Sequence, residues 1–176
     1  SAGVQAETPS FELTIEQVTS GPKHHFFGYI GQCQTIPWNP SGRYILGMEI
    51  ATIDRMPKPE EAAAVVHVDT DQNNKILQVD MTHAWNPQQG TMFYWNPQAP
   101  ETQFFFNDRD VESGKVFTVL YDVELNQRVR EYRYDDTPIG NGGVSQKAGA
   151  FLGLNYGRLA RLRLVTGYPG ALDWSK

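Results

Sequence analysis

Residues 38–46 read WNPSGRYIL, and residues 95–97 repeat the same Trp-Asn-Pro shortly before a second apolar run, QFFFN at 103–107. Two more strand-like runs follow each copy: AVVHVDTD and NKILQVDM after the first, KVFTVLYDVE and NQRVREYRY after the second. Asp69 and Asp122 close the third run of each unit. A unit of four strand-like runs that recurs every roughly 40 to 60 residues is typical of a β-propeller blade.

A third and weaker copy continues the pattern, because KAGAFLG at 147–153 aligns with SGRYILG at 41–47. The sequence therefore predicts an all-β fold, a β-propeller of four-stranded antiparallel blades, with about three blades in this chain. The expected blades are about 30–82, 83–138 and an incomplete 139–176, after a flexible N-terminus at 1–10. ELTIEQVT at 12–19 is predicted to be a lone strand ahead of the first unit.

Three blades cannot close a ring, since propellers need at least four. An open stack would also leave apolar blade faces uncovered, which repeat proteins avoid. We therefore expect either that the chain is part of a larger propeller or that several copies assemble, so that the remaining blades or other copies cover the open faces. In either arrangement Trp38 and Trp95 are expected to pack between neighbouring blades as wedges.

The composition excludes several classes of function. The formal net charge of -5 argues against nucleic acid as a partner, because phosphate binding needs a basic surface. No apolar run is long enough for a membrane helix. Cys33 is the only cysteine and is expected to be a small apolar filler, and His67 lies in a buried-looking strand and is expected to be a hydrogen-bonded core histidine. Periplasmic, secreted and cytoplasmic locations all remain open.

Five motifs in order along the chain carry a resemblance to a known family: PKHHFFGY at 22–29, WNPSGRYIL, HAWNPQQGTMFYW at 83–95, FNDR at 106–109 and LNYGRLARLR at 154–163. Together they resemble the N-terminal part of oligogalacturonate-lyase-like β-propeller proteins. The resemblance implies a seven-bladed propeller that cleaves uronic-acid oligosaccharides by β-elimination at a Mn²⁺-dependent site in its central funnel. The metal ligands and the catalytic base of that family match no position here, so the metal ligands are left unassigned.

Polar residues lie in the segments that enter each unit. Gln88 and Gln89 precede the second unit, Gln32 and Gln34 the first, and the third entry contains Asn141 and Gln146. In a propeller such segments line one mouth of the central channel, where amides would contact a sugar hydroxyl or a cation. The alternative is that these amides only satisfy strand ends and channel waters.

Charged and imidazole groups complete the candidate site. Arg109 is predicted to bind a uronate carboxylate through its guanidinium and to neutralise charge as the α-proton leaves, or else to pair with an Asp in a surface turn. His83 is the histidine that best suits the funnel, and both residues are candidate catalytic groups. Further candidates for substrate binding are Asn107, Arg158, Asn155, His24 and His25. His24 and His25 are adjacent, so on a strand they would face opposite ways.

Two functions from different classes follow. The first is a carbohydrate-active enzyme that acts on an acidic oligosaccharide, with much of its active site in later blades and with Mn²⁺ or another divalent cation implied by the resemblance alone. The second is a non-catalytic propeller that binds a glycan or a protein. A metal together with a catalytic base would separate the two.

Overall fold

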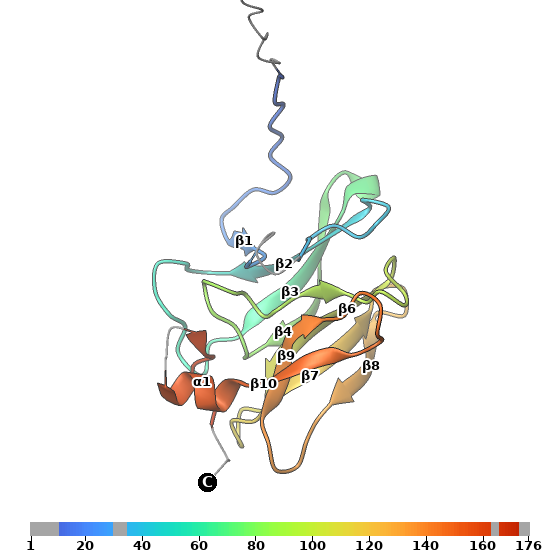
Figure 1. The fold of residues 1–176 in the computed structure, drawn as a ribbon. Helices are drawn as coiled ribbons and strands as arrows, with labels where there is room; N and C mark the ends of the chain where they lie inside the picture. The colour runs from blue at the N-terminus through green and yellow to red at the C-terminus, as the bar shows by residue number, and fades with distance from the viewer. Residues whose placement is uncertain (1–10, 30–34, 163–165, 173–176) are drawn as a thin grey trace, which may run out of the picture.

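The computed structural model describes residues 11–29, 35–162 and 166–172. The predicted flexible segment 1–10, together with Gln32, Cys33 and Gln34, lies outside these residues. The described chain is all-β: ten strands form three antiparallel sheets of four, four and two strands, with one α-helix (Figure 1). The described helices include none that could cross a membrane.

Each sheet is built from strands that are consecutive in sequence. The first sheet has the order β1-β2-β3-β4, the second β5-β6-β7-β8, and the third pairs β9 with β10. The bounds of the elements are β1 (His24–Phe26), β2 (Tyr44–Ile50), β3 (Ala63–Asp69), η1 (Thr70–Gln72), β4 (Lys75–Thr82), β5 (Tyr94–Trp95), β6 (Gln103–Arg109), β7 (Val116–Asp122), β8 (Gln127–Tyr132), β9 (Ile139–Val144), β10 (Phe151–Asn155) and α1 (Tyr156–Leu162).

The predicted strand-like runs of both units are confirmed as β2, β3 and β4 and as β6, β7 and β8. The lone strand expected at 12–19 is wrong, because no neighbouring strand supplies hydrogen bonds to that segment, which projects from the body of the molecule (Figure 1). The first sheet begins at β1, ahead of the expected start at residue 30. The helix α1, which follows β10 directly, was not predicted.

The two Trp-Asn-Pro motifs form turns with the same hydrogen bonds. The backbone N–H of Asn39 donates to the carbonyl of Tyr44 at 3.0 Å, and that of Asn96 donates to the carbonyl of Gln103 at 2.8 Å. Both asparagines are buried, and both lead into the second strand of a sheet. The side chain of Asn39 also accepts a hydrogen bond from the N–H of Tyr44 at 2.9 Å. The repeated motif is thus a repeated turn between the first and second strands.

The paired aspartates at the ends of β3 and β7 also have one role. Asp69 accepts a hydrogen bond from the N–H of Asp71 at 3.1 Å, and Asp122 accepts one from the N–H of Glu124 at 3.0 Å. Aspartate favours such turns because its side chain bonds the backbone two residues further on. Arg43 donates from Nη2 to Asp69 at 3.0 Å, and this ion pair lowers the pKa of the Asp69 carboxyl. The internal repeat therefore extends from the strands to the turns.

The triple phenylalanine of β6 packs against both neighbouring sheets. Phe104 and Phe106 belong to an apolar cluster with Leu46, Met48 and Val65 of the first sheet. Phe105 belongs to a second cluster, against which Val144 of β9 also packs. Because side chains on a strand alternate between faces, consecutive phenylalanines fill the two seams in turn. The second sheet is therefore buried on both sides.

The two repeated tryptophans differ in their surroundings. Trp95 packs against Phe104 and donates from Nε1 to the carbonyl of Pro37 at 3.1 Å, so it joins the first and second units as the wedge prediction requires. Trp38 is 48% exposed and forms only an isolated bridge with Ile45. For Trp38 the wedge prediction is wrong among the described residues, because no sheet lies on the outer side of the first unit.

His67 on β3 is buried as expected, with its ring edge-on to Tyr44 at 4.9 Å between centroids. Its Nδ1 atom has no hydrogen-bond partner among the described residues, unlike the hydrogen-bonded histidine that was expected. Burial lowers the pKa of His67 below its ordinary value of 6.5. The folded protein therefore holds this imidazole neutral in a pH range where the unfolded chain protonates it.

This pKa predicts a pH-dependent stability. As the pH falls through about 6.5 the unfolded state takes up a proton that the folded state refuses, so the free energy of unfolding declines. We expect His67→Gln to lose less stability than the wild type when urea unfolding is compared at about pH 7.5 and pH 5.5. Equal losses in the two proteins would show that His67 titrates normally.

Candidate functional site

The connections that follow the even-numbered strands of each sheet meet at one end of the molecule. Because the strands are antiparallel, residues 51–62, 83–93, 110–115 and 133–138 leave the sheets at this end, which we call the loop end. Residues 166–172 join them: the N–H of Leu172 donates to the carbonyl of Gly114 at 3.0 Å. Trp85 Nε1 likewise donates to the carbonyl of Glu61 at 2.8 Å. Segments distant in sequence thus form one hydrogen-bonded surface.

Arg109, the last residue of β6, lies beneath this surface and is only 3% exposed. Its Nη2 donates to the carbonyl of Pro59, and its Nε donates to the carbonyl of His83 at 3.4 Å. Burial lowers the pKa of the guanidinium, and the negative charges of Asp108 and Asp110 oppose that effect. No carboxylate within the described ranges forms an ion pair with Arg109. The surface turn pair that was the alternative for Arg109 is therefore absent.

Gln89 and Asn86 anchor the segment after α1. Gln89 Nε2 donates to the carbonyl of Thr166 at 3.0 Å, and Asn86 Nδ2 donates to the carbonyl of Gly167 at 2.9 Å. Asn86 Oδ1 accepts from the N–H groups of Gln88 and Gln89, which fixes the turn that carries both glutamines. Gln89 is buried, whereas Gln88 is exposed at the loop end. Of the two predicted amides, only Gln88 is presented to solvent.

Asn107 is the centre of a buried polar network just below the loop end. Its Nδ2 donates to the carbonyl of Asn141 at 2.9 Å and to the hydroxyl of Tyr168 at 3.1 Å. Its Oδ1 accepts from the backbone N–H of Asn141 at 2.7 Å and from Thr118 Oγ1 at 3.2 Å. Burial raises the pKa of the Tyr168 phenol well above its ordinary value, so the hydroxyl stays protonated. Asn107 and Asn141 are fully buried and join β6 to β9.

The turn that carries the glutamines approaches the backbone after β1 very closely. Gly90 has φ +63°, and a β-carbon there would collide with the carbonyl of Phe27. Gly42 has a similar φ of +78° but has no atom within 4 Å of such a β-carbon. The two glycines share the left-handed conformation and differ in the space around them.

We therefore expect Gly90→Ala to lower the free energy of unfolding by about 3 kcal/mol, the sum of left-handed strain and steric overlap. Gly42→Ala, the matched control, should cost about 1–2 kcal/mol from strain alone. Urea denaturation of the two variants measures both. A loss at Gly90 no greater than that at Gly42 would show that the two backbones do not meet.

Of the other predicted site residues, His83 lies in the segment after β4, and Asn155 and Arg158 lie at the start of α1. His83 is half-buried at the loop end, where its N–H donates to Asp108 Oδ1 at 2.9 Å. Asn155 caps the helix α1, because its Oδ1 accepts from the N–H of Arg158 at 2.9 Å, and Arg158 is exposed on that helix. The helix N-cap that asparagine favours was thus a signal for α1 in the sequence.

Three further candidates lie on β1 and after β9, and His24 pairs with Ile50 at the end of β2, so β1 begins at the loop end. His24 and His25 occupy β1, where His25 Nε2 is 3.4 Å from Glu49 on the adjacent strand. Gln146 follows β9 and lines a hollow with Trp38 and Pro97. This hollow lies beside the Trp-Asn-Pro turns, at the end of the sheets opposite the loop end. The prediction that Gln146 shares one channel mouth with the other amides is wrong, because β9 carries the chain across the sheet before Gln146.

An ion cluster around Arg128, beside Asp108, was not predicted from the sequence. Arg128 of β8 donates to Asp80 at 2.7 Å, to Asp108 at 2.9 Å and to Glu131 at 2.8 Å. Burial lowers the pKa of Arg128, but the hydrogen bonds to Asp80 and Glu131 outweigh it, so the pKa is raised. The cluster ties β8 to the end of β4 and holds the Asp108 carboxylate that accepts from His83.

The Mn²⁺ implied by the family resemblance has no evident set of ligands in this part of the chain. Among the described residues, no group of three His, Cys, Asp or Glu side chains is arranged to hold a metal ion. We therefore derive no chemical step through a metal from these residues.

The chain matches no model of a protein family, no curated protein and no solved structure.

Proposed function

We propose that the three sheets are successive blades of a larger β-propeller of seven blades, of which this chain forms about three. The observation that carries this proposal is the burial of β6 on both faces: Phe104 and Phe106 contact one neighbouring sheet and Phe105 the other. A two-layer sandwich buries only one face of each sheet, whereas a stack of blades buries both faces of an inner blade. The remaining blades would cover the outer faces of the first and third sheets.

Within this architecture, we propose that the loop end binds an acidic oligosaccharide. The support is the chemistry of the residues that meet there: Arg109 is a buried cation with no ion-pair partner among the described residues, and exposed Gln88 and half-buried His83 lie on adjoining turns. A buried positive charge attracts a carboxylate strongly because little solvent screens it. The polar amide of Gln88 would bond a sugar hydroxyl.

The reaction that suits this site is β-elimination next to a uronate carboxylate. A base removes the proton on the carbon beside the carboxylate, the carbon–oxygen bond to the leaving sugar breaks, and a carbon–carbon double bond forms. In this proposal Arg109 stabilises the negative charge that develops on the carboxylate, and His83 accepts the proton. Groups in the later blades would complete the site.

An absorbance assay tests the activity. The chain, alone and joined to any further blades, is incubated with oligogalacturonate, and unsaturated uronate absorbance is followed with Mn²⁺ added and then chelated. We expect absorbance to grow, and Arg109→Gln to slow it by about 100-fold, as removal of a charge-stabilising donor does in other enzymes. Arg130→Gln, on the outer strand β8, should leave the rate unchanged once both variants are shown to be folded. No growth in any sample would contradict the enzymatic proposal.

A non-catalytic glycan- or protein-binding propeller is the second candidate. This candidate is favoured because the side chains of Gln89 and Arg109 already donate hydrogen bonds to carbonyl groups of this chain, which gives both residues a structural role. Calorimetric binding of oligogalacturonate with no absorbance change would select this function over catalysis.

A further inference from the structure

Gly170 lies directly against the guanidinium of Arg109 at the loop end. A β-carbon on Gly170 would lie 2.9 Å from Cζ of Arg109 and 2.8 Å from Cβ of Pro59, distances that real β-carbons do not reach. The guanidinium donates from Nη2 and Nε to backbone carbonyls, whereas its Nη1 donates to no group among the described residues. The backbone at Gly170 thus covers a cation that keeps a free donor.

Gly170 belongs to a tight turn at residues 168–171. The N–H of Ala171 donates to the carbonyl of Tyr168 at 3.0 Å, which closes the turn. Pro169 and Gly170 occupy its two central positions, and Gly170 has φ +78°. Proline followed by a left-handed glycine is the pair that a type II turn favours. The local sequence therefore specifies the turn that lies over Arg109.

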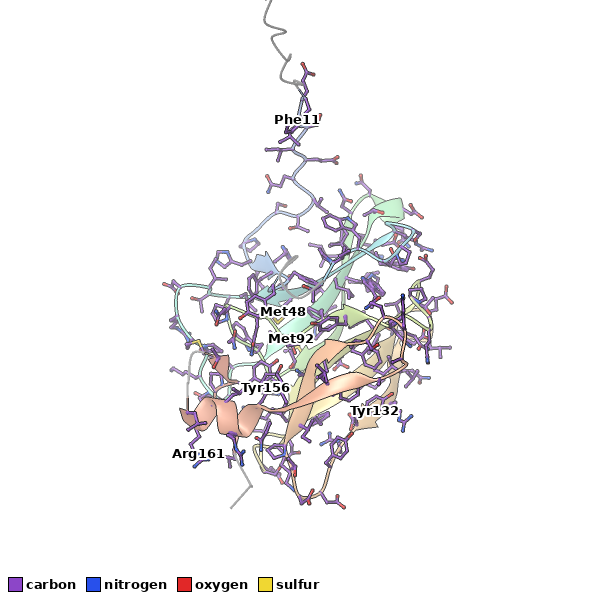
Figure 2. The ribbon with its side chains drawn as sticks, viewed as in Figure 1. Phe11, Met48, Met92, Tyr132, Tyr156 and Arg161 are labelled. Atoms are coloured by element: carbon purple, nitrogen blue, oxygen red, sulfur yellow. The ribbon has the colours of Figure 1, made fainter. Side chains whose placement is uncertain are left out.

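Tyr168 fixes the beginning of this turn in the interior. Its side chain is fully buried, and its ring stacks on that of Tyr156 with 4.5 Å between centroids. Figure 2 shows Tyr156 where α1 meets the sheets. The hydroxyl of Tyr168 also accepts a hydrogen bond from Asn107 Nδ2 at 3.1 Å. Tyr168 is therefore an anchor that cannot leave without disrupting the buried polar network.

The residues after this anchor are held more weakly than those before it. The carbonyls of residues 166 and 167 accept from the side chains of Gln89 and Asn86. Residues 169–172, which we call the cover, form one hydrogen bond to another segment among the described residues, from the N–H of Leu172 to the carbonyl of Gly114. Segments with few hydrogen bonds open at a lower free energy than their surroundings. The cover is thus the part of this segment that opens most easily.

The cover belongs to a connection that is repeated in every sheet. Residues 166–172 and α1 follow the second strand of the third sheet, as 51–62 follow β2 and 110–115 follow β6. The first two sheets bring their equivalent connections to the same place, because Pro59 accepts from Arg109 and Gly114 accepts from the cover. Three equivalent connections therefore meet around one buried cation.

We propose that the cover opens about Tyr168 to admit a carboxylate to Arg109, and that Gly170 sets how readily it opens. The inference rests on the proposed function, in which that carboxylate belongs to a uronate. The closed cover blocks the side of the guanidinium that Gly170 occupies. The open cover leaves Nη1 available for a charge-assisted hydrogen bond to the carboxylate.

Gly170→Ala should shift the cover towards its open form. The new β-carbon adds left-handed strain and collides with Arg109 and Pro59, and both costs exist only while the cover is closed. We expect opening to become about tenfold more frequent. Gly42→Ala is the matched control, because Gly42 has the same φ of +78° but no atom within 4 Å of its added β-carbon.

Labelling with phenylglyoxal measures the opening, since this reagent bonds to two nitrogens of an accessible guanidinium and its adducts are mapped by mass spectrometry. We expect Arg109 to be labelled about tenfold faster in Gly170→Ala than in the wild type, and at the wild-type rate in Gly42→Ala. Arg128, which is paired with Asp80, should be labelled equally in all three proteins, which separates opening from global unfolding. Equal rates at Arg109 in the two alanine variants would overturn the proposal.

Hydrogen exchange tests the cover in the wild type, without any substitution. Opening breaks the bond from the N–H of Leu172 to Gly114 but leaves the N–H of Asn141 bonded to Asn107 Oδ1. We therefore expect the Leu172 N–H to exchange faster than the Asn141 N–H. Equal protection of the two groups would contradict a cover that opens separately from the core.

Monomeric galacturonate separates the cover from the proposed function. Because the carboxylate binds only the open form, its apparent affinity should rise by the same factor as the opening. We expect the galacturonate concentration that halves the labelling of Arg109 to fall about tenfold in Gly170→Ala. The same concentration in both proteins would contradict the cover. Faster labelling with no protection by galacturonate would instead contradict the carboxylate site of the proposed function.

Discussion

Asn107→Ala is expected to lower the free energy of unfolding by about 3–5 kcal/mol. The substitution removes the acceptor for the N–H of Asn141 and for the hydroxyl of Thr118, and the donor to the carbonyl of Asn141. All of these groups are buried where water does not replace the lost partners. The Asn141 carbonyl keeps its hydrogen bond from the Tyr156 hydroxyl at 2.9 Å, whereas the Asn141 N–H and the Thr118 hydroxyl are left unpaired at about 1–3 kcal/mol each. The large expected effect comes from the loss of several buried hydrogen bonds through a single side chain.

Urea denaturation measures this effect. Gln127→Ala, an exposed amide on β8, is the control and should change stability by less than about 0.5 kcal/mol. If Asn107→Ala were as mild as the control, β6 and β9 would not be joined through this side chain, and the placement of the third sheet would be wrong.

Phe104→Ala is expected to cost a similar amount, about 3–5 kcal/mol, because it opens a cavity in the seam between the first and second sheets. The Phe104 ring is fully buried and lies 5.4–6.0 Å from the rings of Phe93, Trp95, Phe106 and Tyr121, measured between centroids. Three of these rings, those of Trp95, Phe106 and Tyr121, are carried by paired strands and cannot collapse into the space.

Phe105→Ala provides the comparison for this second prediction. Phe105 faces the opposite seam and lines the open groove, so its removal leaves less enclosed space and should cost less than the loss of Phe104. Thermal and urea unfolding of the two variants give both values. A larger loss at Phe105 than at Phe104 would contradict the assignment of these adjacent rings to a closed seam and an open one.

The sequence was sufficient to predict β2, β3 and β4 of the first sheet and β6, β7 and β8 of the second, but it did not predict β1. The apolar runs at 44–50 and 103–109, the repeated Trp-Asn-Pro turns and the paired aspartates depend on local chemistry, which a single sequence displays directly. The segment at 12–19 also has a strand-like pattern, an alternation of apolar and polar residues, but forms no strand, because a strand also needs a neighbour for its hydrogen bonds. The helix α1 was not predicted because it is short, and the N-cap residue Asn155 was the local signal for it.

The candidate site was less accessible to sequence reasoning. The contact of Arg109 with the segment 83–93, through the carbonyl of His83, follows from the antiparallel order of the strands, and the repeat indicated that order. Whether Gln89 faces solvent or donates to Thr166 depends on a contact between segments distant in sequence, which no local pattern reveals. The Arg128 cluster was missed for the same reason, since its partners Asp80 and Asp108 belong to other strands.

The aromatic rings in the two seams show whether the three sheets stack in succession, with the second sheet between the first and the third. Nuclear Overhauser effects between assigned ring protons report whether the three sheets stack in succession. We expect contacts of Phe93 with Phe27, whose ring centroids are 5.7 Å apart across the first seam, and of Phe105 with Phe151, 6.2 Å apart across the second. Contacts of Phe105 with Phe27 in place of Phe151 would contradict it, because both rings would then lie in a single seam.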